Sequence, residues 1–129
     1  MKESVCFEDV LLVPKYSTIE SRTAVDQSSE LSPSVVLQMP VISAPMDTIS
    51  EEDMATALDS VGGMAVIHRY NTIEEQTNIV RLSRGLGAVN VGAAVGATGD
   101  YLERAVELVS AGAKAICIDI AHGHHILMM

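Results

Sequence analysis

The sequence predicts an α/β protein of about four strand–helix units with a parallel sheet, which fits either part of an eight-stranded (β/α)8 TIM barrel or a doubly wound sheet. Three observations predict this class. Four short apolar runs end at Ser43, Ile67, Val95 and Asp119, so the runs recur after 24, 28 and 24 residues. Segments with helix-capping signals separate them. Hydrophobic residues make up 48% of the 129 positions and aromatic residues only 3%, which suits helices packed on a buried parallel sheet.

The first unit joins an expected strand at 40–44 to a helix that begins after Ser50. Ser50 and Asp53 have the spacing of a capping box, in which each side chain bonds the backbone of the other. An apolar stripe marks the buried face of this helix: Met54, Leu58 and Val61. Two consecutive glycines at 62–63 end the helix, and a second strand is expected at 64–67.

The second unit begins with another capping box, formed by Thr72 and Glu75. Three residues line one face of its helix: Ile73, Gln76 and Val80. The helix is expected to end near Arg84, and a third strand is expected at 88–95.

The third unit has the clearest helical pattern in the chain. Asp100 is the expected cap, with Glu103 in the reciprocal position. Its apolar stripe has four members: Leu102, Ala105, Val106 and Val109. Gly112 suits the position after the helix. The fourth strand is expected at 115–119.

Consecutive units of this size imply right-handed crossovers and a parallel sheet. Two architectures have such connections, a doubly wound open sheet and part of a barrel. A whole barrel needs about 250 residues, so four units make half of one. On the barrel interpretation, residues 1–129 form one partial barrel, whose open sheet leaves two unpaired edges that favour association.

Polar and glycine residues gather where the expected strands end, at 43–47, 67–70, 92–96 and 119–125. Both architectures bind ligands beyond the carboxyl ends of their strands. Asp119 is the sharpest candidate, because a carboxylate just past a strand can accept hydrogen bonds from two ribose hydroxyls. The alternative is that Asp119 caps a following helix or orders its loop.

His68 and Arg69 also follow a strand, so they are expected on the same side as Asp119. Arg69 suits a phosphate or carboxylate ligand. A salt bridge from Arg69 to Glu74 or Glu75 is the alternative.

Two further features carry weaker hypotheses. Met46 suits contact with a purine ring, and the alternative is core packing. His122, His124 and His125 invite a metal hypothesis, but their spacing matches none of the usual zinc pairs. We therefore expect no metal site, and expect these histidines to line a loop beside a ligand.

Charge and terminal composition argue against several classes of protein. The net charge is −9 and no run of Lys or Arg exists, which argues against a nucleic-acid partner. The N-terminal residues lack the apolar region of a signal peptide, and no apolar run is long enough to span a membrane. Cys6 and Cys117 lie far apart, and neither has the surroundings of an activated thiol. A cytoplasmic, reducing location is expected.

Six motifs, in order, resemble the inosine monophosphate (IMP) dehydrogenase and guanosine monophosphate (GMP) reductase family, and together they span nearly the whole chain. They are FEDVLLVP at 7–14, SAPMDT at 43–48, GGMAVIHR at 62–69, IEEQ at 73–76, VGAAVG at 91–96 and IDIAHGH at 118–124. Each motif alone is weak, and the ordered set is specific.

The resemblance implies a (β/α)8 TIM barrel, usually in a tetramer, of which this chain is the N-terminal half with about four strand–helix units. It also assigns residues to two ligands. Ser43, Ala44 and Met46 are expected beside the purine nucleotide. Four residues are expected at the dinucleotide, NAD or NADP. Asp119 is expected at the nicotinamide ribose with Ala121 beside it, and Thr98 near the adenosine end. His68 is expected on the rim between the two ligands.

Dehydrogenases of the family oxidise IMP with NAD and commonly carry a pair of CBS modules after the second helix, where this chain has only Gly-Leu-Gly at 85–87. We therefore expect no CBS domain. Loss of the insert is normal for the reductases, which convert GMP to IMP with NADPH, and it also occurs in some dehydrogenases. The 91–96 motif and the segment 103–112 favour the dehydrogenase, with the reductase as the alternative.

The family's catalytic cysteine, phosphate loops, monovalent-cation loop (potassium, for example) and mobile flap come later than residue 129. The resemblance thus implies a chain inactive alone, which needs the remainder of the barrel. The alternative to an enzyme fragment is a non-catalytic half-barrel that assembles with itself or with a partner.

Overall fold

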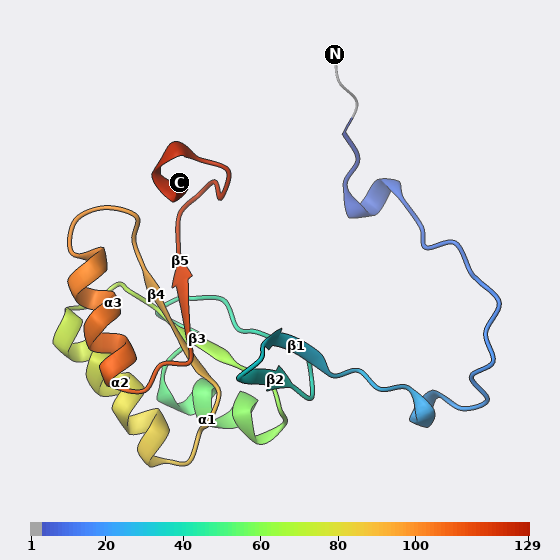
Figure 1. Ribbon diagram of the computed structural model, residues 1–129, viewed down its shortest axis with the longest axis horizontal. Coiled ribbons are helices and arrows are strands. Elements are labelled where there is room, and N and C mark those ends of the chain that lie inside the picture. The colour runs from blue at the N-terminus through green and yellow to red at the C-terminus, as the bar shows by residue number, and fades with distance from the viewer. Residues whose placement is uncertain (1–3) are drawn as a thin grey trace.

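The computed structural model describes residues 4–129, and Figure 1 shows a compact body with a long N-terminal arm. The expectation about the first three residues lies outside this described part. The elements in chain order are η1 (Phe7–Asp9), η2 (Arg22–Ala24), β1 (Ser29–Ser32), β2 (Val35–Leu37), α1 (Glu52–Ser60), β3 (Ala65–Ile67), α2 (Ile73–Gly85), β4 (Val91–Val95), α3 (Tyr101–Ser110), β5 (Ala115–Ile118) and η3 (Ile126–Met128).

The centre of the body is a parallel sheet whose strands follow one another in chain order, β3-β4-β5. The expected strand at 40–44 is reduced to a single parallel bridge between Ile42 and Met64, which places this segment beside β3. The predicted order of four consecutive parallel segments is therefore confirmed, although the first is not a full strand. The expected strand at 88–95 begins only at Val91.

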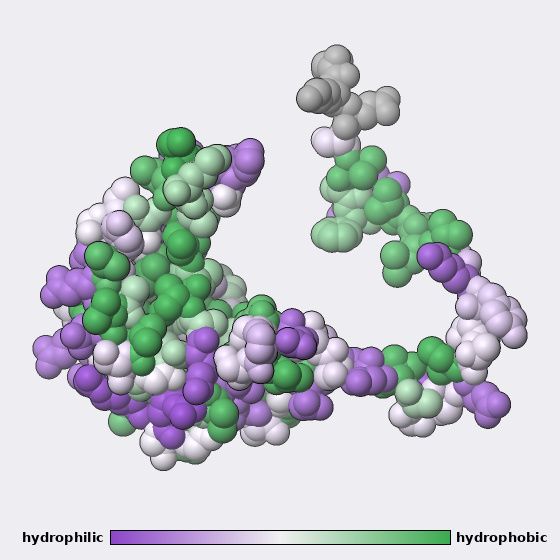
Figure 2. All heavy atoms as spheres, viewed as in Figure 1, coloured by the Kyte–Doolittle hydropathy of each residue, from purple (hydrophilic) through white to green (hydrophobic). Residues whose placement is uncertain are grey.

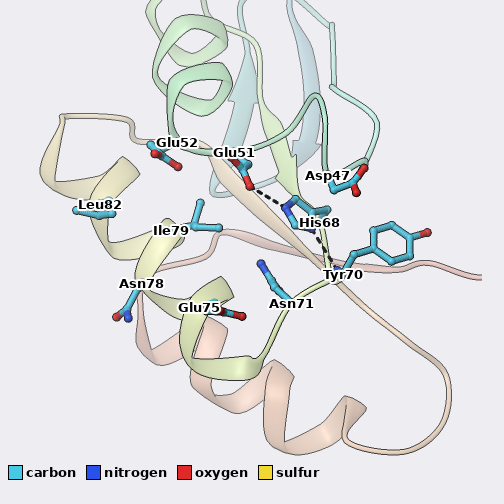
Figure 3. A pocket seen from close by; sticks show the side chains of 10 residues that line it. All are labelled: Asp47, Glu51, Glu52, His68, Tyr70, Asn71, Glu75, Asn78, Ile79 and Leu82. Carbon is cyan, nitrogen blue, oxygen red and sulfur yellow. Dashed lines mark hydrogen bonds and ion pairs between the residues drawn. The ribbon is translucent and has the colours of Figure 1, made fainter.

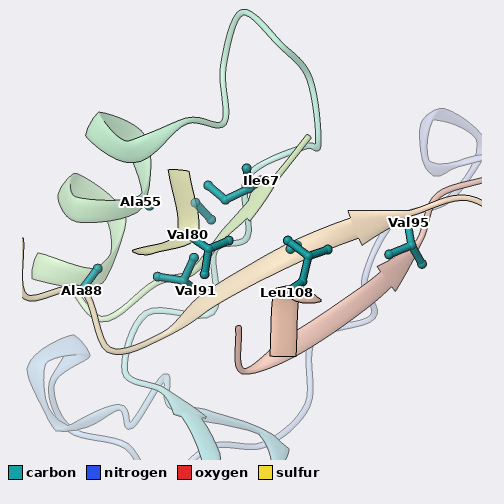
Figure 4. Packing of buried hydrophobic residues seen from close by; sticks show 9 residues of the cluster. Ala55, Ile67, Val80, Ala88, Val91, Val95 and Leu108 are labelled. Carbon is teal, nitrogen blue, oxygen red and sulfur yellow. The ribbon is translucent and has the colours of Figure 1, made fainter. Parts of the chain in front are cut away.

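The three helices of the described residues pack on one face of this sheet. Their buried side chains Ala55, Val80 and Leu108 join one cluster with Ile67 and other outward-pointing strand residues (Figure 4). A doubly wound sheet has helices on both faces. The observed one-sided arrangement, with its strand order in sequence, disfavours the doubly wound alternative.

The opposite face of the sheet is covered in part by a hairpin that the sequence analysis did not predict. β1 and β2 are antiparallel, and Val35 and Leu37 of β2 pack against Met64, Val66 and Ala94. Because side chains alternate along a strand, Val66 points to this second cluster while its neighbours Ala65 and Ile67 point to the helices.

One of the three predicted helix caps is confirmed. The Thr72 hydroxyl accepts the Glu75 N–H at 3.1 Å, and the Glu75 carboxylate accepts the Thr72 N–H at 2.9 Å. The cap at Ser50 was wrong: Glu51 occupies the N-cap position of α1, and the buried Ser50 hydroxyl serves another contact. Asp100 is the N-cap residue of α3, but its carboxylate bonds a side chain one turn later and caps nothing.

Two predicted buried stripes were also wrong in part. Leu102, Val106 and Val109 on α3 are 65%, 56% and 57% exposed, whereas Leu108 is fully buried and Arg104 nearly so. α3 contacts α2 and β4. Ala105 of the stripe packs against the buried cluster, whereas the other three members are exposed. Val61, expected on the buried face of α1, lies beyond the end of that helix and is exposed.

The arm before β1 carries its apolar side chains in the open. Phe7, Leu11, Leu12 and Tyr16 are among the most exposed hydrophobic residues of the described chain. Figure 2 shows hydrophobic and hydrophilic residues side by side along this arm, which extends away from the body. No helix among the described residues is long and apolar enough to cross a bilayer.

Candidate functional site

The loop at 43–50 is held in a tight turn by the buried hydroxyl of Ser50. This hydroxyl donates to the Ala44 carbonyl and lies 2.6 Å from the Ser43 hydroxyl. The Met46 carbonyl accepts the Ser50 N–H at 2.9 Å, and the Ser43 N–H bonds the Met64 carbonyl at 3.0 Å beside β3. Three predicted site residues, Ser43, Ala44 and Met46, are thus brought together on one ordered loop.

Met46 is half exposed, so the core alternative for this residue does not hold. The residue that organises the loop, Ser50, was missed as a site residue because its spacing to Asp53 suggested a helix cap. A pair of serines seven residues apart gives no sequence signal for such a contact.

His68 lies at the carboxyl end of β3 and is 3% exposed, which corrects the expectation of a rim position. The Tyr70 N–H donates to His68 Nδ1 at 3.2 Å. Nδ1 is therefore an acceptor, and Nε2 carries the proton that it donates to Glu51 Oε1 at 3.1 Å. The ring fixes the start of α1 against the strand end.

His68 also lines an open cavity of about 610 Å³ between α1 and α2 (Figure 3). Its wall is acidic, with Asp47, Glu51, Glu52 and Glu75 facing it. The residues that line this cavity come mainly from α1, α2 and the segments just before these helices. Asp119 does not line it, and neither do the loop residues Ser43, Ala44 and Met46.

Arg69, the next residue, is paired with the strongest site candidate. Its Nε donates to Asp119 Oδ2 at 3.2 Å, and its Nη2 donates to the Asp119 carbonyl at 3.1 Å. Arg69 does form a salt bridge, as the alternative predicted, but its partner is Asp119 instead of Glu74 or Glu75. The Asp119 N–H continues the ladder between β4 and β5 by donating to the Val95 carbonyl at 2.8 Å.

The two remaining predicted residues lie in exposed loops at the same edge of the sheet. Thr98 is in the turn between β4 and α3, and Ala121 follows β5 by three residues. Both loops leave the carboxyl ends of neighbouring strands. Thr98 and Ala121 therefore share an edge with Asp119, and no contact joins them to it.

A buried hydrogen-bond network, which the sequence analysis did not predict, holds the ends of β3 and β4 in place. Gln76 Nε2 donates to the Ile67 carbonyl at 3.2 Å and to the Ala94 carbonyl at 2.8 Å, near the ends of β3 and β4. Arg104 then donates to Gln76 Oε1 at 2.9 Å and to Asp100 Oδ2 at 2.8 Å. Hydrogen bonding to Arg104 holds the pKa of the Asp100 carboxyl below its ordinary value.

The two cysteines are free thiols in different surroundings. Cys6 is exposed on the arm. Cys117 packs against the cluster on the hairpin face of the sheet. Burial raises the pKa of the Cys117 thiol, and the Asp119 carboxylate raises it further. Both effects disfavour the thiolate, the nucleophilic form of cysteine.

The histidines after β5 make local contacts. The His122 and His124 rings meet edge-on at 6.3 Å between centroids, and His125 Nδ1 accepts the Leu127 N–H at 3.2 Å. Within residues 4–129 no three His, Cys, Asp or Glu side chains converge as a metal-binding group. The metal hypothesis thus gains no support from these histidines.

The whole described chain is similar to one known protein family. A model of the IMP dehydrogenase / GMP reductase domain matches residues 4–129. An inosine-5'-monophosphate dehydrogenase of Nitrosopumilus maritimus is 46% identical over 90 residues, which is 70% of this chain and 19% of that protein.

Two other relatives show both names within the family. An inosine-5'-monophosphate dehydrogenase of Staphylococcus aureus is 49% identical over 80 residues, or 62% of this chain and 16% of that protein. A GMP reductase of Leishmania donovani is 38% identical over 81 residues, or 63% of this chain and 16% of that protein. The matched part of this chain thus spans less than a fifth of the length of these relatives.

Proposed function

The chain belongs to the IMP dehydrogenase / GMP reductase family of oxidoreductases, and on that premise we propose that it forms part of an enzyme that oxidises IMP to xanthosine monophosphate with NAD. In this proposal the chain supplies the first half of a (β/α)8 barrel. It carries residues for both ligands and lacks the nucleophile that attacks the purine.

The observation that carries the proposal is the state of Asp119 at the carboxyl edge of the sheet. The side chain of Asp119 is 27% exposed, and within the described part of the chain only one of its carboxylate oxygens accepts a hydrogen bond. A carboxylate offers about four acceptor positions, so about three remain for a ligand. A pair of neighbouring ribose hydroxyls presents the donors that such a carboxylate accepts.

The ordered loop at 43–50 supports a second, neighbouring ligand. Its Ser43 hydroxyl and exposed Met46 are placed by the Ser50 contacts described above. We assign Ser43, Ala44 and Met46 to the purine nucleotide. A hydroxyl can bond a polar group of the nucleotide, and the Met46 thioether can pack on the flat purine ring.

We assign Asp119, Ala121 and Thr98 to the dinucleotide, because their loops leave adjacent strands at one edge. NAD accepts the hydride when bound, and the residues of this chain orient its ribose. His68 receives a supporting role and not direct contact, because its ring is buried and both nitrogens have partners. The monovalent cation that the resemblance implies is assigned to no residue of this chain.

The absence of a suitable nucleophile supports the view that this chain does not act alone. The reaction needs a thiolate that attacks the purine. Cys117 is on the packed face of the sheet with a raised pKa, and Cys6 is on the arm. The exposed stripe on α3 and the unpaired edge of β5 support docking of the remaining barrel. We further propose that the complete enzyme is a tetramer in the cytoplasm.

GMP reduction with NADPH is the second candidate. Two observations favour it: the match to GMP reductases, and the short connection of residues 86–90 between α2 and β4, with no inserted domain. A non-catalytic half-barrel remains the alternative if no parent activity exists.

The two reactions are separated by assaying the protein made from the gene's complete reading frame. IMP-dependent formation of NADH, with no oxidation of NADPH by GMP, is the expected result. NADPH oxidation that depends on GMP would assign the reductase instead. Neither activity, in a protein that is folded by circular dichroism, would refute the enzyme proposal.

A further inference from the structure

Arg69 spans the carboxyl ends of three strands and holds Asp119 at two points. It follows β3, and its partner follows β5, so its side chain crosses the end of β4. We propose that Arg69 is a positioning residue of the dinucleotide site, which orients the Asp119 carboxylate toward the ribose hydroxyls. The inference rests on the proposed role of Asp119.

The two bonds from Arg69 fix both the side chain and the backbone of Asp119. Nε reaches Oδ2 at 3.2 Å and Nη2 reaches the carbonyl oxygen at 3.1 Å. A single bond to the carboxylate leaves it free to rotate about the side-chain torsions. A second bond to the carbonyl of the same residue sets the guanidinium relative to the chain, and thereby the carboxylate.

The pairing leaves the outer oxygen of the carboxylate open. Among residues 4–129, Oδ1 has no hydrogen-bond partner, and Oδ2 accepts only the Nε proton. Each oxygen offers about two acceptor positions. Arg69 therefore orients Asp119 and leaves acceptor positions free for a diol. A bidentate pair to both carboxylate oxygens would occupy more of these positions.

The guanidinium has one further contact, with an aromatic ring. It lies over the Tyr70 ring, with 5.6 Å between Cζ and the ring centroid, a cation–π geometry. The guanidinium also passes close to the end of β4, because a Cβ placed on Gly96 would lie 3.7 Å from Nη1, an ordinary contact distance.

An arginine serves this role better than a lysine. The two acceptors on Asp119 are a side-chain oxygen and a backbone oxygen, and a planar fork with fixed N–H directions matches two such points. An ammonium group carries the charge but has no fixed fork, so it holds one point at a time.

The test uses kinetics of the protein made from the complete reading frame. Arg69→Met is expected to raise the KM for the dinucleotide about tenfold, with the KM for the purine nucleotide unchanged. Arg69→Lys is expected to recover part of this loss. Arg81→Met, on the exposed face of α2, is the matched control and is expected to change neither constant.

A double variant separates this inference from the proposed function. In an Asp119→Ala background, adding Arg69→Met is expected to have no further effect on the KM for the dinucleotide, because the carboxylate to be positioned is gone. An additive loss would show that Arg69 binds the ligand itself and would overturn the inference. If Asp119→Ala alone leaves this KM unchanged, the proposed function of Asp119 fails instead.

Discussion

Replacing Arg104 with methionine tests whether the buried polar network supports the carboxyl ends of the strands. Arg104 is 8% exposed and donates to Gln76 Oε1, the Asn71 carbonyl and the Asp100 carboxylate at 2.9, 3.1 and 2.8 Å. Methionine keeps most of the apolar stem, so the change removes hydrogen bonds with little change in packing.

The expected cost follows from the groups left without partners. Two acceptors beside α3, on Gln76 and Asn71, lose their donors, at about 1 to 2 kcal/mol each. The pair with Asp100 adds at most about 1 kcal/mol, because the aspartate side chain is 47% exposed and screened by water. The unfolding free energy should fall by about 3 kcal/mol and the Tm by roughly 10 °C.

The assay is urea unfolding of the chain, followed by far-ultraviolet circular dichroism. Arg81→Met is the matched control, because Arg81 is exposed and makes one long bond of 3.4 Å to Asn78. This control should lose less than about 0.5 kcal/mol. A loss below about 1 kcal/mol for Arg104→Met, or equal losses for the two variants, would refute the reasoning.

Three further predictions concern other contacts of the described chain. Ser50→Ala should lower the unfolding free energy by about 1 to 2 kcal/mol, because the 43–44 segment loses its buried partner; an unchanged urea midpoint would contradict this. Asp100→Asn should be less stable than the parent chain at neutral pH. The lowered pKa of Asp100 means that this stabilisation is present above the ordinary 3.8 and is lost as the pH falls through the lowered value. The two chains should therefore converge in acid urea titrations, and a difference that stays constant below pH 3.8 would exclude the ion pair as its source. In a maleimide reaction resolved by peptide mass analysis, Cys6 should be labelled before Cys117, whose thiol is partly buried and has a raised pKa; equal rates would contradict the packing of Cys117.

Local patterns predicted the sheet and helices well, because a strand run or a capping box needs only neighbouring residues. The Thr72 and Glu75 box is the clearest case. The same logic failed at Ser50, where a contact with the Ser43 hydroxyl replaces the helix cap. The hairpin of β1 and β2 was missed because its strands are four and three residues long and lack a strong turn signal.

The α3 stripe failed for a different reason. Amphipathic spacing shows that a helix has an apolar side, but it does not show which neighbour covers that side. Val106 is more than half exposed, and Arg104, which looks like a surface residue in the sequence, donates to the buried Gln76. Its burial has no local signature, since its pair with Asp100 is four residues away on the same helix, whereas its acceptors on Gln76 and Asn71 lie 28 and 33 residues away.

The site residues divide in the same way. The position of Asp119 after a strand was predictable from the apolar run before it. Its pairing with Arg69 was not, because 50 residues separate the two and only the order of the strands brings them together. The ligands assigned to Asp119 and to the 43–50 loop stay predictions.

The most direct measurement of the central claim is a comparison of Asp119→Ala with Ser43→Ala in the protein made from the complete reading frame. The account predicts that Asp119→Ala raises the KM for the dinucleotide alone and that Ser43→Ala raises the KM for the purine nucleotide alone. Folded variants in which neither constant changes, or in which the two effects are exchanged, would contradict it.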